Sequence, residues 1–317
     1  MEKTVNRKPL QGVFNIIRFN WHYYVSAMLI FGFVVICQNI YLGLWKLFWT
    51  ALIFYITYSV LISLLVSYYI YDFKDFYSLN WLKLINVEKP KNIININAGF
   101  DETSLILEDK FPNSELKVLD FYNPEKNTEI SIERARKSYP PYENTIVVEA
   151  DNLSIQDNIS DLIFLIFAAH EIRKSNDRII FFQELNRILE KNGKIILIEH
   201  LRDFSNFLAF NIGFFHFHSK KTWKNDIEKA SLKISSEYKL TIFTSLFIIE
   251  KNGNPSYNSW LFVCNSSICT RLFVKIFQLE TRIKSNKFNQ QTNDGSAYFF
   301  CSINCSWNWF VEYFLFS

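Results

Sequence analysis

The sequence predicts a doubly wound α/β domain preceded by a pair of apolar helices. The α/β prediction rests on Leu162–Phe167 and Lys194–Ile198, two short apolar runs that flank a helical segment. Buried parallel strands read as charge-free blocks of this kind, and a helix between two of them makes a βαβ unit. Among the 317 residues the hydrophobic fraction is 49% and the charged fraction 21%. The apolar excess lies before Asp72 and after Asn254, so we assign residues 79–253 to the α/β domain.

Two apolar segments near the N-terminus predict a membrane hairpin within residues 1–78. Tyr24–Ile40 and Leu47–Tyr71 carry no charge, and each is long enough for a hydrocarbon core of about 30 Å. Basic residues precede the first span: Lys3, Arg7, Lys8 and Arg18. Because the turn at Leu42–Lys46 offers only one lysine, the positive-inside rule predicts a two-span membrane protein with its N-terminus and the α/β domain in the cytoplasm. The alternative is a buried helical pair of a soluble protein.

Charge and cysteine content exclude other classes of protein. The net charge is +3, and without a Lys/Arg block it argues against nucleic-acid binding. The α/β region has no cysteine, which favours a reducing compartment over a disulfide framework. Beyond residue 253 no helical or strand period persists. We interpret residues 254–317 as an irregular and non-native extension, such as a shifted reading frame.

The first half of the α/β domain predicts three strands with polar residues at their ends. The strands are Asn92–Ile96, Leu116–Leu119 and Thr145–Val148. Asp120 ends the second strand, where carboxylates of α/β nucleotide sites accept hydrogen bonds from ribose hydroxyls; alternatively it caps the following helix. Gly99, in the turn after the first strand, is either a plain turn residue or a place where a ligand approaches the backbone.

The second half predicts a cluster of titratable residues at the same sheet edge. His170 and Glu171 follow Leu162–Phe167, while Glu199 and His200 end the next strand and are expected to face the same crevice. An imidazole there suits a general base; alternatively His170 and Glu171 only begin a helix. That helix is expected to include Ile172 and to end at Gly193 in a left-handed cap.

The remaining segments complete the domain. Phe204–His218 is core, a cap over the substrate pocket, or a surface that touches the bilayer. A helix is predicted over Thr222–Leu232 and two strands over Tyr238–Leu240 and Leu246–Glu250. Arg202 is expected to pair with Asp203 or Glu199. No metal site is expected, since His216 and His218 lack nearby carboxylate or cysteine partners in the sequence.

The run LNRILEKNGKIILIEHLRD, residues 185–203, resembles the fifth-strand region of class I S-adenosylmethionine-dependent methyltransferases. The resemblance extends over Trp81–Gly253 and implies a seven-stranded, mostly parallel sheet that ends in an antiparallel pair. It also implies S-adenosylmethionine as cofactor. The glycine motif of the family is degraded here, because Asn95 stands at the acidic position and two other residues replace glycines: Asn97 and Asp101.

The resemblance assigns roles to particular residues. It implies that Asp120 holds the ribose, and that Asp151 meets the adenine amino group with Asn152 or Leu153 beside the ring. Alternatively Asp151 is a solvated loop residue. Asn95, Asn97 and Gly99 would meet the methionine part of the cofactor.

We therefore expect a membrane-anchored methyltransferase that acts on a small or lipophilic acceptor, with the bilayer as partner. The candidate catalytic residues are His170, Glu199 and His200. Methyl transfer depends mainly on positioning two reactants, which explains the lack of a sharp catalytic motif. The rival is an inactive domain that senses S-adenosylmethionine or S-adenosylhomocysteine. A nicotinamide-dependent oxidoreductase would need a G-x-G-x-x-G turn, which the chain lacks.

Overall fold

The structure is a computed structural model, and it describes residues 7–253 except 75, 86, 88 and 126–129. The interpretation of residues 254–317 as an extension, with Cys264, Cys269, Cys301 and Cys305, lies outside the described residues. The described residues belong to a single compact unit.

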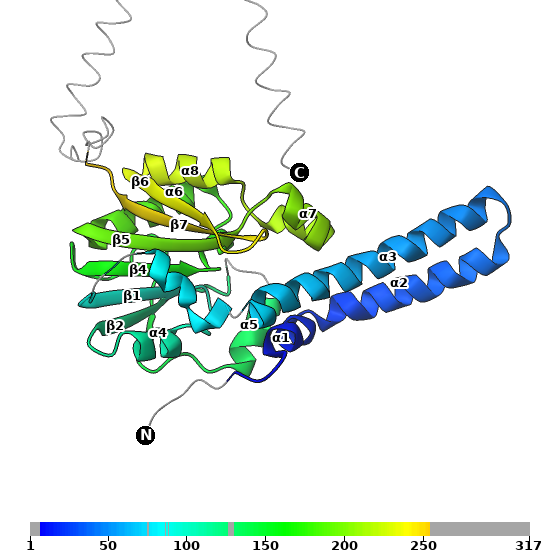
Figure 1. Cartoon of the computed structure of the whole chain (residues 1–317), viewed down its shortest axis with the longest axis horizontal. Helices are drawn as coiled ribbons and strands as arrows, with labels where there is room; N and C mark the ends of the chain where they lie inside the picture. Colours follow the sequence, from blue (N-terminus) through cyan, green and yellow to red (C-terminus); the bar gives the residue numbers. More distant parts are fainter. Residues whose placement is uncertain (1–6, 75, 86, 88, 126–129, 254–317) are drawn as a thin grey trace, which may run out of the picture. The chain divides into compact units, whose positions relative to one another are not determined.

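Three helices precede the sheet: α1 (Gln11–Phe19), α2 (Trp21–Ile40) and α3 (Leu44–Tyr68). Helix α2 carries no Asp, Glu, Lys or Arg and α3 carries only Lys46. Both helices run through the predicted spans, and they pack side by side (Figure 1). Gln38 Nε2 donates to Thr50 Oγ1 at 3.2 Å and ties the two helices together. Both helices are long and apolar enough to cross a membrane, and only 11% of each apolar window is buried. Most of their side chains therefore remain at least partly exposed in the described structure.

The seven strands form one sheet in the order β3-β2-β1-β4-β5-β7-β6. Their bounds are β1 Asn92–Asn97, β2 Glu115–Asp120, β3 Ile146–Val147, β4 Ser160–Ile166, β5 Leu189–His200, β6 Leu232–Lys239 and β7 Thr244–Lys251. Strands β1 to β5 pair in parallel, whereas β7 is antiparallel to both β5 and β6. The predicted fold class is confirmed: the sheet is mostly parallel, doubly wound and like that of class I methyltransferases.

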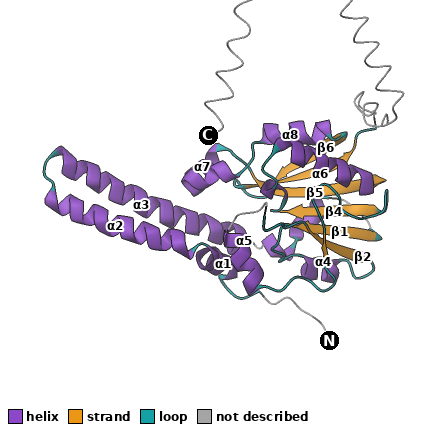
Figure 2. Ribbon diagram, turned by 180° about the vertical axis from the view of Figure 1, so that it is seen from behind, coloured by secondary structure: helices purple, strands orange, loops and turns teal. Residues whose placement is uncertain are grey.

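Five further helices accompany the strands (Figure 2). They are α4 Ser104–Lys110, α5 Ile130–Ser138, α6 Ser175–Ile188, α7 Phe204–Phe210 and α8 Lys220–Lys229. Successive strand residues point to opposite faces of a sheet, so Ile163 and Phe164 of β4 enter two different core clusters. Both faces of β4 are covered, which explains why its residues Leu162–Ile166 carry no charge.

The strand order reverses at β1, whose neighbours β2 and β4 lead to opposite halves of the sheet. In doubly wound sheets, ligands bind beyond the carboxyl ends of the strands at such a switch point. The carboxyl ends of β1 and β4 are therefore the place where the fold itself predicts a site.

Several predicted boundaries were wrong. A 3₁₀ turn covers Ala169–Glu171, and α6 begins at Ser175, so Ile172 lies outside the helix. Gly193 lies inside β5 and is not in the left-handed region. A glycine is required at position 193 for another reason. An added Cβ would lie 2.8 Å from the Ser160 carbonyl oxygen, which is closer than a methyl group tolerates.

Candidate functional site

A cavity of about 230 Å³ lies over the carboxyl ends of β1 and β4. Its floor includes Asn95 and Asn97 of β1, and Ile166 of β4 adds an apolar wall. Helix α1 lines it with Asn15, Ile16 and Phe19, and α5 with Ser131, Ile132 and Ala135. The cavity thus occupies the switch point of the sheet, and α1 forms part of its wall.

Helix α1 is fixed to the segment that follows the apolar pair. Its backbone N–H groups of Gly12 and Val13 donate to the two carboxylate oxygens of Asp72 at 2.9 and 3.1 Å. Carboxylates suit this position because the first N–H groups of a helix lack partners within it. A Cβ on Gly12 would lie 2.5 Å from the Cβ of Tyr71, so only glycine permits this approach.

Glu102 fixes the same helix from the α/β side. Its Oε1 accepts hydrogen bonds from Asn15 Nδ2 at 3.3 Å and Gln11 Nε2 at 3.4 Å, both in α1. The Tyr139 hydroxyl donates to Asn15 Oδ1 at 2.8 Å. Sequence reasoning missed α1, although its buried residues Gly12, Asn15 and Phe19 recur at helical spacing.

Asn95 and Asn97 both reach the cavity, but their side chains also hold the protein together. Asn95 Nδ2 donates to Ser104 Oγ at 2.8 Å and to Thr103 Oγ1 at 3.1 Å. Its Oδ1 is buried and has no hydrogen-bond partner among the described residues. Asn97 Oδ1 accepts from the backbone N–H of Gly99 at 3.0 Å. A buried acceptor without a partner is costly, so Asn95 Oδ1 is suited to a donor group of a ligand.

Gly99 has a φ of +96°, which explains the glycine. A Cβ there would lie 2.9 Å from the Tyr122 side chain and 3.0 Å from that of Ile132. Gly99 does not line the cavity in the described structure, whereas its neighbours Ala98 and Phe100 do. The space next to Gly99 is therefore filled by the protein.

Asp120 ends β2 as predicted, and it is buried with 3% of its surface exposed. Its Oδ1 accepts from the Tyr122 backbone N–H at 2.9 Å, and its Oδ2 forms an ion pair with Arg136 of α5. The guanidinium of Arg136 lies 4.7 Å from the centre of the Tyr122 ring. The carboxylate predicted to hold ribose is thus occupied by an arginine that sequence reasoning did not single out.

Asp151 and Asn152 lie in the loop after β3, and both are exposed. Asn152 Oδ1 accepts from the Ser154 backbone N–H at 3.1 Å. Neither residue lines the cavity, and neither does Asp120. The structure therefore brings Asn95 and Asn97 together at the cavity, and leaves the three residues predicted for ribose and adenine outside its wall.

The residues after β4 and at the end of β5 form a connected cluster. His170 Nδ1 lies 2.7 Å from Glu199 Oε2, and the His170 backbone N–H donates to Glu199 Oε1 at 3.2 Å. Glu199 is fully buried. Burial alone lowers the pKa of His170, but the charges and hydrogen bonds of Glu199 and Glu171 outweigh it and raise this pKa to about 10.

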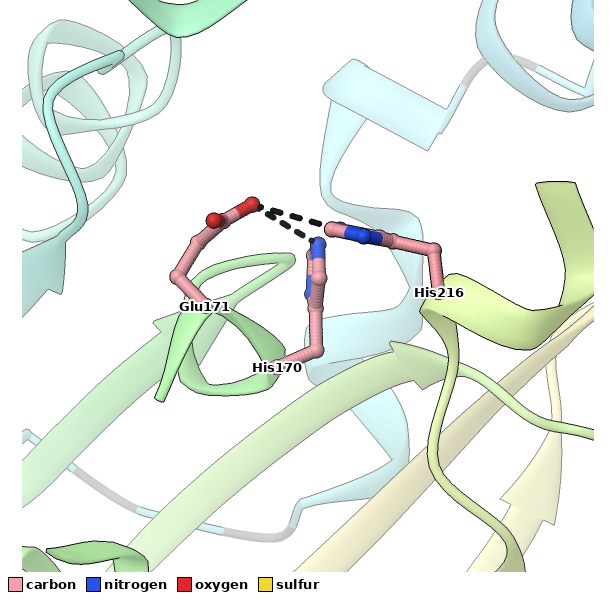
Figure 3. A group of neighbouring side chains, drawn as sticks. All are labelled: His170, Glu171 and His216. Atoms are coloured by element: carbon pink, nitrogen blue, oxygen red, sulfur yellow. Dashed lines mark ion pairs between the residues drawn. The ribbon is translucent and has the colours of Figure 1, made fainter. Parts of the chain in front are cut away.

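Glu171 joins this cluster to a distant part of the chain (Figure 3). Its Oε1 lies 3.2 Å from His170 Nε2 and 3.5 Å from His216 Nε2. Burial raises the pKa of the Glu171 carboxyl, but hydrogen bonds from the two imidazoles outweigh this and hold the pKa below its usual value. Glu171 lines the cavity. The expectation that His216 lacks a carboxylate partner was wrong, because the fold supplies one from the end of β4.

His200 has different partners from its neighbour Glu199. Its Nε2 lies 2.9 Å from the Tyr71 hydroxyl, and its Nδ1 lies 3.1 Å from the Phe243 carbonyl oxygen. The ring stacks on Phe167 with a centroid distance of 4.8 Å. Burial is the main cause that lowers the pKa of His200 to about 4, so this imidazole is neutral at neutral pH.

His200 itself does not line the cavity, but Tyr71 and Phe167 do. A carbonyl oxygen only accepts hydrogen bonds, so Nδ1 of His200 carries the proton and Nε2 accepts from the Tyr71 hydroxyl. The expected pairing of Arg202 with Asp203 or Glu199 was wrong. Arg202 donates instead to the carbonyl oxygens of Phe217 and Phe215, at 2.7 and 2.6 Å.

Residues 124–197 match the family model of a methyltransferase domain. The match runs from the segment before α5 into β5, and it does not include β1 or β2. No curated protein matches the chain. The methyltransferase match supports S-adenosylmethionine as the cofactor.

Solved structures with a similar fold include three from archaea and bacteria. An S-adenosylmethionine-dependent methyltransferase from Methanosarcina mazei is 15% identical, with a TM-score of 0.42, 55% of this chain covered and 98% of that chain. A protein from Pyrococcus horikoshii OT3 is 20% identical, with a TM-score of 0.42 and coverages of 55% and 88%. An S-adenosylmethionine-dependent methyltransferase from Aquifex aeolicus is 16% identical, with a TM-score of 0.39 and coverages of 53% and 86%. These TM-scores do not bear on the activity.

The chain therefore contains a methyltransferase domain in a class I methyltransferase-like fold, with S-adenosylmethionine as its cofactor. The unpartnered Asn95 oxygen fits the ammonium group of the methionine part, since an ammonium is a donor with three hydrogens. The cavity is smaller than the roughly 300 Å³ at which ligand pockets usually begin. Helix α1 forms part of the cavity wall, whereas Arg136 does not line the cavity and pairs with the carboxylate of Asp120.

Proposed function

We propose that this protein transfers the methyl group of S-adenosylmethionine to a small or lipophilic acceptor, while α2 and α3 anchor it in a membrane. The cavity at the switch point between β1 and β4 carries the proposal. The methyltransferase match over residues 124–197 supports the same activity.

The cofactor would lie along the carboxyl ends of β1, β2 and β3. Asn95, Asn97 and the backbone at Gly99 would meet the methionine part, since Asn95 offers an unpartnered acceptor. Asp120 would accept hydrogen bonds from the ribose hydroxyls once Arg136 swings away from it. Asp151 and Asn152 would meet the adenine ring from their exposed loop.

The acceptor would lie against the β4 and β5 side of the cavity. There the Tyr71 hydroxyl would take the acceptor's proton and pass its own to His200 Nε2, to which it is hydrogen-bonded. His170 and Glu199 would act as positioning residues, because they fix Glu171 at the cavity wall. The rest of the catalysis would come from holding two reactants in line.

The membrane anchor favours an acceptor that is dissolved in the bilayer. Helix α7 touches α3, and the Tyr58 hydroxyl donates to the Leu208 carbonyl oxygen at 3.1 Å. Beside this contact, Phe204 and Ile212 leave 73% and 79% of their surface exposed. Large exposed apolar side chains next to a membrane helix suit contact with lipid.

Methyl transfer into lipid tests this proposal. The full chain in detergent would be mixed with S-adenosylmethionine labelled in the methyl group and with fractionated membrane lipid of the source organism. We expect label in one fraction with the wild type, and at least about tenfold less with Tyr71→Phe or His200→Gln, in line with the usual contribution of acid–base groups. Thr57→Val, an α3 change remote from the cavity, is the control. Absence of label in every lipid and small-molecule fraction would overturn the proposal.

A second function, an inactive sensor of S-adenosylmethionine, is favoured by two observations. Arg136 neutralises the carboxylate of Asp120, which is the group predicted to hold the ribose, and Tyr122 fills the space beside Gly99. A domain of this kind would bind the cofactor without turnover. Saturable binding of S-adenosylmethionine without methyl transfer to any fraction would select it.

A further inference from the structure

We propose that His170, Glu171 and His216 form a binding site for a divalent transition-metal ion of the zinc type, at the wall of the cavity. The three residues come from two places in the chain. His170 and Glu171 belong to the 3₁₀ turn after β4, and His216 ends the 3₁₀ helix Asn211–His216 that follows α7. Their side chains converge on one point (Figure 3).

The spacing of the ligand atoms suits such an ion. One nitrogen from each imidazole and one oxygen of Glu171 all lie within 4.8 Å of one another. Zinc bonds to nitrogen and oxygen of about 2.1 Å, in tetrahedral geometry, place neighbouring ligand atoms about 3.4 Å apart. The two measured separations from Glu171 Oε1 are 3.2 Å to His170 Nε2 and 3.5 Å to His216 Nε2. Two of the three distances between the ligand atoms thus already match the spacing around a tetrahedral zinc ion.

The groups behind the ligands are those that metal sites use. A ligating histidine commonly gives its other ring N–H to a carboxylate, which fixes the tautomer and the ring orientation. Glu199 does this for His170: it is fully buried and lies 2.7 Å from Nδ1. His170 Nε2 therefore carries the free lone pair when the imidazole is neutral, and it is the atom that faces Glu171.

Arg173 joins the two segments that carry the ligands. Its Nη1 donates to the His170 carbonyl oxygen at 3.2 Å and also to the His216 carbonyl oxygen. The same nitrogen lies 3.4 Å from His216 Nδ1. Ligation through Nε2 places the proton on Nδ1, so this longest contact would be lost with a bound ion while the two carbonyl contacts remain.

The ligand types indicate which ion is bound. Two imidazoles and one carboxylate suit zinc and its first-row neighbours, whereas magnesium and calcium prefer oxygen ligands alone. Three protein ligands leave at least one coordination position open, as in catalytic zinc sites. Glu171 lines the cavity. On the basis of the proposed function, an oxygen atom of the methyl acceptor would take the open coordination position.

Metal content tests the site without any methyl transfer. The full chain, purified in detergent without a polyhistidine tag, would be dialysed against Zn²⁺ and then against buffer, and its zinc measured by mass spectrometry. We expect about one ion per chain in the wild type, and an affinity at least about tenfold lower in Glu171→Gln and in Glu199→Gln, since even outer residues of metal sites have effects of this size. His216→Ala should lose the ion. Circular dichroism would show that each variant is folded.

A matched control separates this site from general histidine binding. His22 pairs with Arg134 at 2.7 Å, away from the cluster, so His22→Ala should keep the ion. Co²⁺ is the second probe, and its visible absorption should change in His216→Ala and not in His22→Ala. Zinc retained equally by wild type, Glu171→Gln and His216→Ala, or by none of them, would overturn the proposal. Failure of methyl transfer with the ion bound would instead count against the proposed function.

Discussion

The two halves of the sheet edge differ in how their polar side chains are used. On the β1 and β2 half, Asp120 is neutralised by Arg136, and Asn95 is bonded to Thr103 and Ser104. On the β4 and β5 half, His170, Glu171 and Glu199 form one network, and Glu171 faces the cavity. The first half must rearrange to take a ligand, whereas the second is already assembled.

This difference explains why the two halves look so unlike in the sequence. The methyltransferase match includes β4 and most of β5 and leaves out β1 and β2. The departures from the glycine motif lie in the unmatched half. In this unmatched half the Tyr122 and Ile132 side chains fill the space beside Gly99.

The largest effect is expected at Glu199. Removing one charge of a buried pair leaves the other without compensation, which costs about 3 kcal/mol or more. Glu199→Gln should therefore lower the free energy of unfolding by about that amount, as measured by chemical denaturation of metal-free protein. Glu228→Gln is the control, because Glu228 lies 3.8 Å from Lys224 on the surface and such pairs contribute about 1 kcal/mol at most. An equal loss of unfolding free energy in Glu199→Gln and Glu228→Gln would show that the network of the β4 and β5 half is no more important for stability than a surface ion pair.

The next effect is the loss of stability in acid that is caused by His200. The pKa of His200 falls from 6.5 to about 4 in the folded protein, so the unfolded chain binds the extra proton between these values. The stability from this group is complete above pH 6.5 and is lost as the pH falls to about 4, at about 1.4 kcal/mol per pH unit at most.

Unfolding free energies measured across this range should fall less steeply in His200→Gln than in the wild type. The difference should reach a few kcal/mol at the acid end. Identical slopes in the two proteins would mean that His200 is solvated and does not serve as a partner of Tyr71.

On the cofactor half we expect opposite effects from the two members of one ion pair. Asp120→Asn should weaken S-adenosylmethionine binding about tenfold, or about 1.4 kcal/mol, by removing the charged acceptor for the ribose. Arg136→Met should strengthen it, because the competing cation is gone. Equilibrium dialysis with labelled cofactor measures both. Weaker binding in both variants would show that Arg136 itself contacts the cofactor.

The last effect is on the rate of cofactor release and is expected at α1. Gly12→Ala places a Cβ 2.5 Å from Tyr71, so the helix must move, at a cost of about 1 to 3 kcal/mol. We expect faster cofactor release, measured by stopped flow. Gly32→Ala in α2 is the matched control, since nothing lies within 4 Å of the added atom. Unchanged release in Gly12→Ala would show that α1 does not close the cavity.

The sequence predicted the parallel strands well because charge-free blocks such as Leu162–Phe167 have few other places in a soluble domain. It also located His170 and Glu199, since residues at the carboxyl ends of neighbouring strands meet at one edge.

The antiparallel edge was predicted poorly: the expected helix Thr222–Leu232 ends earlier, at Lys229, and the strand expected at Tyr238–Leu240 is β6, Leu232–Lys239. The ends of helices were harder to predict: Gly193 is required by the carbonyl oxygen of Ser160, a contact between segments distant in the sequence.

The site was only partly predictable for the same reason. Nothing local marks Arg136 as the partner of Asp120, because a basic residue within a helix usually faces solvent. The contact between Glu171 and His216 depends on how the segment after α7 folds back over β4. Helix α1 lies ahead of the apolar spans, and its partner Asp72 follows them, so their contact appears only in three dimensions.

The most direct test of the central claim is to find where the cofactor binds. Ultraviolet crosslinking of labelled S-adenosylmethionine to the full chain in detergent, followed by peptide mapping, would identify the contact. We predict label in the peptides that contain the cavity-lining residues of two segments, among them Asn95 and Asn97 of β1 and Ser131 of α5, and less label when unlabelled cofactor competes. Competable label confined to peptides outside residues 92–171 would contradict the account.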